Sequence, residues 1–336
     1  MPFIPTSPAS ALRRVALAAV CLAALGGCAT EVDQTTAGSG GGDGAGGSPE
    51  PVPPSQVYVI DSKGAYGPSR IDGFDSLTSK TWVTYGADQQ AFAACKPVLD
   101  REGRLLFLDN SPGHVHIVRI DDLSGAGRVT FGDGDFGVDL FAALSGLAVD
   151  AADRIYVTDP VRRQIVRVDD MSGNGLTTFG GNEGSGVGEF KSPDGIAISS
   201  KGKILVGDWD SARIVEMDDM TGAGWSTFSF PNGKRGTAVI SGVAYDAKDR
   251  LYAVDFENSL LYRLDAIDGA GLTVFVAPDQ LQDVFVHPSG RIYLGFLNVL
   301  QAVAQMDDMD GTGFVVYDGP GQGLERFYNP CGIVAR

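Results

Sequence analysis

GLAVDAADRIYVTD at residues 146–159 returns, with few substitutions, as GIAISSKGKILVGD at residues 195–208. Each stretch is followed by a second matching one, QIVRVDDMSGNGLTTFG at residues 164–180 and RIVEMDDMTGAGWSTFS at residues 213–229. The repeating unit has roughly 48 residues, which is too few to bury a core of its own. The sequence therefore predicts a ring or array of similar units that stack against one another.

A turn of one or two Asp residues followed by Gly-x-Gly marks each copy. A degenerate first copy lies at Asp72. Five full copies follow, at Asp121 with Asp122, Asp169 with Asp170, Asp218 with Asp219, Asp265, and Asp307 with Asp308. Runs of alternating β-branched and polar residues lie between the turns and predict about four strands per copy. Six such copies predict an all-β fold, a six-bladed β-propeller, which closes on itself and leaves few strand edges open.

The two ends of the repeat region complement each other. Residues 56–61 match the second strand of the later copies, so the first copy lacks its first strand. Residues 329–334 (NPCGIV) match residues 192–197 (SPDGIA), which are the first strand of another copy. We therefore expect a propeller over residues 55–336 in which the C-terminal strand completes the N-terminal blade.

The copy GSGVGEFKSPDGIA at residues 184–197 resembles the NHL-repeat family, whose units run from a Gly-rich loop through Phe and Pro-x-Gly-Ile-Ala-Val to a Gly-x-Ile-Tyr-Val-x-Asp strand. The resemblance extends from about Gln56 to the end of the sequence. It implies a six-bladed propeller but no single activity, because propellers of this type include protein-binding modules, nucleic-acid binders and a zinc-dependent amidating lyase.

The N-terminal residues 1–27 have the features of an export signal. Arg13 and Arg14 precede an uncharged run over residues 15–25 that is too short to span a bilayer. LGGC at residues 25–28 looks like a bacterial lipobox, so cleavage before Cys28 would leave that cysteine as the lipid-bearing first residue, with palmitate among the acyl chains we expect. The alternative is an ordinary secretory signal cleaved near Ala29.

The segment 28–54 is rich in Gly, Ser and Pro and is expected to be a tether. Ala29, rather than Asp, after the cysteine resembles the pattern that sorts lipoproteins to the outer membrane of double-membraned bacteria. The expected location is therefore the cell envelope, with the membrane contacted through the lipid.

The formal net charge of −16 argues against nucleic acid as a partner, since such proteins present a basic face. Many of the acids belong to the repeated turns. They suggest either a ring of carboxylates for calcium or a cationic partner, or Asp residues that cap tight turns, and we favour the turn role. We expect a monomer.

The innermost strands are expected to line the axial channel. Their first residues are Gly in four blades, whereas Lys96 and Asp283 stand in the other two, on either side of the closing blade. These two side chains are predicted to face each other near the channel mouth, either to bind a ligand or, as we favour, as an internal ion pair.

Cys95 and Cys331 hold the same repeat position in adjacent blades, just before the innermost strands. They are the only thiols left once Cys28 is lipidated, and the exported compartment is oxidising. We predict a disulfide that joins the closing strand to its neighbour, rather than a metal site made from the same cysteines.

Features that an enzyme would need are sparse. The amidating lyase that NHL propellers resemble uses channel histidines for zinc, but His114, His116 and His287 are not expected to converge. Six-bladed lactonases hold calcium with Glu, Asn and Asp, for which the candidate channel residues are Asp194, Gln282, Asp283 and Asn329, with Lys96 beside them. No cofactor is expected, except that Asp194 and Asp283 would be the ligands if calcium binds.

Loops between the second and third strands bring aromatic and basic side chains to the rim, the face where the innermost strands begin. The candidate contact residues are Tyr66, Arg162, Arg163, Trp209, Arg213 and Phe256. Such residue types dominate interfaces, although packing between blades explains Trp209 and Phe256 equally well. The sequence thus predicts a lipid-anchored extracytoplasmic binding or scaffold protein that uses its rim face, with a metal-dependent channel lyase or lactonase as the alternative.

Overall fold

The computed structural model describes residues 56–62, 69–77, 79, 82–86, 94–111, 114–132, 134, 140–233, 236–319 and 326–336. The predicted signal segment 1–27, the tether 28–54 and Tyr66 lie outside these residues. No helix formed by the described residues has the length and hydropathy needed to cross a bilayer.

Six four-stranded antiparallel sheets form the blades of a β-propeller, as the sequence predicts. Blade one consists of β24 (Pro330–Ala335), β1 (Val57–Asp61), β2 (Arg70–Phe74) and β3 (Trp82–Tyr85). Blade two consists of β4 (Ala94–Leu99), β5 (Leu105–Ser111), β6 (His114–Ile120) and β7 (Val129–Gly132). Blade three consists of β8 (Leu147–Val149), β9 (Ile155–Asp159), β10 (Gln164–Val168) and β11 (Thr177–Gly180).

The remaining three blades follow the same order. Blade four consists of β12 (Pro193–Ile198), β13 (Ile204–Asp208), β14 (Arg213–Met217) and β15 (Ser226–Ser229), with a 3-10 turn at Trp209–Ser211. Blade five consists of β16 (Ile240–Tyr245), β17 (Leu251–Asp255), β18 (Leu260–Leu264) and β19 (Thr273–Val276). Blade six consists of β20 (Leu281–Val286), β21 (Ile292–Phe296), β22 (Ala302–Met306) and β23 (Val315–Tyr317).

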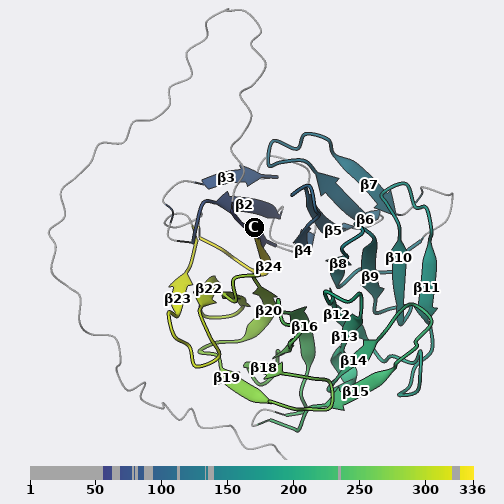
Figure 1. The fold of residues 1–336 in the computed structure, drawn as a ribbon. Helices are drawn as coiled ribbons and strands as arrows, with labels where there is room; N and C mark the ends of the chain where they lie inside the picture. Colours follow the sequence, from purple (N-terminus) through teal and green to yellow (C-terminus); the bar gives the residue numbers. More distant parts are fainter. Residues whose placement is uncertain are drawn as a thin grey trace, which may run out of the picture. The chain divides into compact units, whose positions relative to one another are not determined.

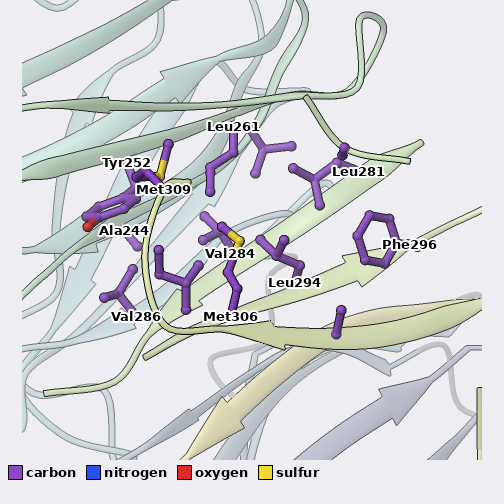
Figure 2. Packing of buried hydrophobic residues seen from close by; sticks show 14 residues of the cluster. Ala244, Tyr252, Leu261, Leu281, Val284, Val286, Leu294, Phe296, Met306 and Met309 are labelled. Atoms are coloured by element: carbon purple, nitrogen blue, oxygen red, sulfur yellow. The ribbon is translucent and has the colours of Figure 1, made fainter. Parts of the chain in front are cut away.

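The first strand of every blade lies innermost, and the fourth lies at the outside of the ring (Figure 1). The predicted closure is confirmed, because β24 pairs with β1 over Ala335↔Val57 to Pro330↔Asp61. The core lies between neighbouring blades. Figure 2 shows one such layer, in which Leu261 from blade five packs with Val284, Leu294 and Phe296 from blade six.

The turns with two Asp residues have the structural role that the sequence favours, whereas Asp72, predicted as the degenerate first copy, lies within β2 and not in a turn. The second Asp accepts a hydrogen bond from the backbone N–H two residues later, as in Asp170 with Ser172 (2.8 Å) and Asp219 with Thr221 (2.8 Å). The glycine that follows adopts φ of +80° at Gly173 and +79° at Gly222, a conformation that other residues rarely adopt.

The Asp that ends the second strand ties down the loop leading into the innermost strand. Asp61 Oδ1 accepts the N–H groups of Tyr328 (2.8 Å) and Asn329 (2.7 Å). Asp208 Oδ1 accepts those of Lys191 (3.0 Å) and Ser192 (2.8 Å). These contacts fix where each innermost strand starts, and hence what surrounds the axis.

Candidate functional site: the axial cavity

A cavity of about 470 Å³ runs along the propeller axis. All six innermost strands line it, and so do residues of the hairpins that follow them. Its volume is in the range of small-molecule sites in proteins. Much of the wall is apolar and partly accessible, as at Val98, Ala197, Tyr245 and Phe285.

An ion pair lies at the rim end of this cavity. Lys96 Nζ is 2.8 Å from Asp283 Oδ1, and the two side chains are only 14% and 11% exposed. The structure thus brings together the two charged residues that the sequence sets apart from the glycines of the other blades. Their low exposure shows that little solvent reaches the pair at this end.

Irregular pairing directs the Lys96 side chain to this position. The register of β4 with β5 shifts between Cys95 and Val98, and Lys96 lies in this bulge with φ of +56°. Similar shifts occur at the rim ends of β12, β16 and β20. Bulges of this kind redirect side chains and are common next to functional sites.

Asp194 adds a second buried carboxyl group to the rim end. It is 9% exposed, and its Oδ1 accepts a hydrogen bond from Ser145 Oγ. Burial raises the pKa of Asp194 to about 7, an effect that Lys96 opposes and Asp283 reinforces. Burial alone would lower the pKa of Lys96, but the carboxylates of Asp283 and Asp194 outweigh it and raise the pKa.

The candidate calcium ligands do not form a site that fits a divalent cation. The Lys96 ammonium already lies against Asp283, where such an ion would have to bind. Gln282 Oε1 and Asn329 Oδ1 are buried and accept no hydrogen bond from a described residue, yet neither residue lines the cavity. No group of three or more His, Cys, Asp or Glu side chains suited to a metal occurs among the described residues.

The opposite end of the cavity is open. We call this side the hairpin face, because it carries the turns between the first and second strands and between the third and fourth. Arg101 and Arg336 line the cavity there, and both are exposed. Arg101 follows β4 by two residues, and Arg336 directly follows β24. Sequence reasoning missed both residues.

The Cys95–Cys331 disulfide is present, as predicted. Its Cα atoms are 5.6 Å apart, and the bond links residues separated by 236 positions in the chain. Cys331 lies in β24 and Cys95 in β4, so the bond joins the innermost strands of blades one and two.

Several predicted rim residues are occupied by internal contacts. The prediction that Arg213 offers an exposed contact is wrong, because this residue is 5% exposed and its guanidinium binds Asp208 and the carbonyl oxygens of Gly184, Ser185 and Glu189. The local chain folds around this one cation, and the strand pattern does not reveal that requirement.

The other described rim residues are partly exposed. Arg162 donates to the carbonyl oxygen of Leu140 (2.6 Å), and Arg163 pairs with Glu183 (3.1 Å). Trp209 and Phe256 pack against each other across neighbouring blades, with ring centroids 5.3 Å apart. The rim thus has less free basic and aromatic surface than the sequence suggests.

The histidines do not gather at the axis. His287 lies in a turn of the hairpin face, where Nδ1 is 2.7 Å from Ser289 Oγ and Nε2 is 2.5 Å from the carbonyl oxygen of Arg336. His114 and His116 lie at the start of β6 in blade two. This placement agrees with the sequence expectation that the three do not converge.

Comparison with solved structures supports the propeller fold. A chain of the nidogen/laminin complex superposes with a TM-score of 0.63 at 18% identity, over 83% of this chain and 97% of that chain. Catalytically inactive virginiamycin B lyase from Staphylococcus aureus with quinupristin gives a TM-score of 0.53 at 14% identity, over 79% and 84%. A protein of unknown function from Bacteroides caccae gives 0.57 at 13%, over 83% and 98%.

Comparisons at the sequence level find no relatives. No known family profile matches the chain, and no curated protein is significantly similar to it. The likeness to solved structures therefore establishes the six-bladed propeller and leaves the activity to be inferred from the site.

Proposed function

We propose that this protein is a lipid-anchored, extracytoplasmic binding protein of NHL-like propeller type that binds a small molecule in its axial cavity. The observation that carries the proposal is the cavity of about 470 Å³, with the ion pair of Lys96 and Asp283 at its rim end and its opening at the hairpin face. A binding role also agrees with the structural likeness to a chain of the nidogen/laminin complex. The net charge of −16 makes nucleic acid an unsuitable partner.

Filling the cavity tests this function. Ala197 lines the wall, so Ala197→Phe is expected to reduce the space for a ligand, whereas Ala151→Phe places the same ring on an exposed hairpin. The measurement is ligand-observed NMR with a set of cationic, anionic and neutral fragments. We expect fragments that bind the wild type and Ala151→Phe but not Ala197→Phe. If no fragment binds, or if all hits survive Ala197→Phe, the cavity is not the binding site.

The anchor is tested separately. Full-length chain expressed in a double-membraned bacterium is expected in the membrane fraction, and Cys28→Ala is expected to release it to the soluble envelope fraction. Cys21→Ala is the matched control, because Cys21 lies in the segment that the signal peptidase removes. A wild-type protein that is soluble and carries no acyl mass would overturn lipid anchoring.

A further inference from the structure

We infer that the axial cavity takes a small amphipathic carboxylate, with its apolar part along the axis and its carboxylate between Arg101 and Arg336 at the hairpin face. This inference rests on the proposed binding function and specifies the ligand class. The ligand would then enter from the hairpin face, which lies opposite to the predicted rim contact surface.

The wall favours an apolar ligand body. Val98, Ala197, Ile198, Tyr245 and Phe285 come from four different blades, line the cavity and are all partly accessible. Covering such surface contributes about 25 cal/mol per Å² of apolar area removed from water. A chain or ring that reaches down the axis would contact several blades at once.

The mouth favours an anion. The Arg336 guanidinium is held in place by the carbonyl oxygen of Gly103 (2.7 Å) and by Tyr58 Oη (3.2 Å). A guanidinium fixed in this way binds a carboxylate with little loss of conformational freedom, and the pairing is often bidentate. Arg101, in the hairpin that follows β4 of the neighbouring blade, supplies a second cation at the same opening.

Asp100 also lines the cavity here, and Asp153 lies beside Arg101, but neither Arg101 nor Arg336 forms an ion pair with a described residue. Asp100 bonds Arg104 Nε (2.6 Å) and nearby backbone N–H groups, and Asp153 accepts the backbone N–H of Arg101 (3.0 Å).

The rim end explains why the carboxylate lies at the mouth. Lys96 is balanced by Asp283 at 2.8 Å, so this end offers an anion no unpaired positive charge. A second carboxylate there would also be repelled by Asp194 when that group is ionised. The two arginines that form no ion pair with a described residue thus lie at the open end, and the paired Lys96 lies at the other.

Isothermal titration calorimetry with three matched ligands tests the inference. Decanoate, decanol and decylammonium share one apolar chain and differ in charge. The protein is the full exported chain carrying Cys28→Ala, which alters no described residue. We expect decanoate to bind about tenfold or more tightly than the other two, since a hydrogen bond to a charged group contributes roughly 1.5–3 kcal/mol.

Three arginine and lysine variants locate the carboxylate. Arg101→Gln and Arg336→Gln are each expected to weaken decanoate binding about tenfold and to leave decanol unchanged. Lys248→Gln removes an exposed cation from another hairpin of the same face that does not line the cavity, and it should change nothing. Arg101 makes no side-chain contact with Tyr58 or Gly103 of the kind that Arg336 makes, so Arg101→Gln separates binding from folding.

The outcomes distinguish this inference from the proposed function. Equal affinity for all three ligands, or loss of decanoate binding in Lys248→Gln as large as in Arg101→Gln, would overturn the carboxylate class. Binding of decanol or decylammonium that Ala197→Phe abolishes, with no decanoate binding, would refute the inference and keep the cavity as a binding site. If no ligand or fragment binds, both proposals fail.

Discussion

Asp194 shows how strongly the axis changes the chemistry of a single residue. Its ordinary pKa is 3.8, and burial raises this value to about 7 in the folded chain. Between these two values the folded protein keeps a proton that the unfolded chain has released. The resulting stabilisation is complete below the unfolded pKa and is lost as the pH rises through the folded one.

Asp194→Asn is expected to remove this pH dependence. The asparagine keeps an oxygen that accepts the Ser145 hydroxyl, and it cannot ionise. The free energy of unfolding of the wild type should fall relative to the variant between about pH 4 and pH 7, by about 1.4 kcal/mol per unit of raised pKa. Urea unfolding of both proteins across this range measures the difference. Parallel curves would show that Asp194 does not titrate in this window.

Substitutions of Lys96 and Asp283 are expected to have coupled effects on the free energy of unfolding. Lys96→Met leaves a buried carboxylate without its partner, which costs about 3–5 kcal/mol of stability in similar pairs. Adding Asp283→Asn to Lys96→Met should recover more than half of that loss, because no charge remains unpaired. Chemical denaturation of the two single variants and the double variant gives the coupling. Additive losses would mean that solvent reaches this pair freely.

At the scale of the element, the innermost strands require glycine because they come very close to one another. A Cβ on Gly195 in β12 would lie 2.8 Å from the carbonyl oxygen of Ser241 and from the N atom of Val243 in β16. A Cβ on Gly332 in β24 would lie 2.3 Å from Pro97 Cδ in β4. The glycines that recur in the sequence thus mark backbone contacts between blades.

Gly195→Ala is therefore expected to destabilise the protein by roughly 2–3 kcal/mol, because the backbone of β16 cannot move aside without displacing its blade. Gly202→Ala, in the hairpin that follows β12, is the matched control. Its φ is +81° and nothing lies near the added Cβ, so only about 1 kcal/mol of backbone strain is expected. Thermal unfolding compares the two. A smaller loss in Gly195→Ala than in Gly202→Ala would contradict the close approach.

The sequence predicts these elements correctly, but it does not predict how the two ends of the cavity differ. The repeat predicts the blades, the closing strand and the Cys95–Cys331 bond, because each depends on position within a copy. The character of the rim end depends on how far Lys96 and Asp283 are buried, and the burial of Arg213 depends on loop carbonyl groups. Such contacts are made by side chains across blades and leave no periodic pattern.

At the scale of the whole molecule, the disulfide holds the ring closed. It joins residues 236 positions apart and so restricts most of the unfolded propeller. Removing a native disulfide typically costs about 2–5 kcal/mol, and long loops lie at the upper end. We expect Cys95→Ala with Cys331→Ala to lower stability by this amount.

In urea unfolding, the reduced wild-type protein should have the same free energy of unfolding as the double alanine variant. Reductant should not change the stability of the variant. Sensitivity of the variant to reductant would point to another disulfide. A variant as stable as the oxidised wild type would show that pairing of β24 with β1 closes the ring without covalent help.

The pairing of β24 with β1 in blade one also affects how the protein responds to mechanical force. The segment before Gln56 continues into β1, which is held between β24 and β2 rather than at the outside of its blade. A pulling force on that segment would therefore load two strand pairings at once. β24 is in turn bonded through Cys331 to β4. A force that would separate β24 from β1 is therefore also borne by the second blade. The ring thus resists unravelling at its N-terminal strand.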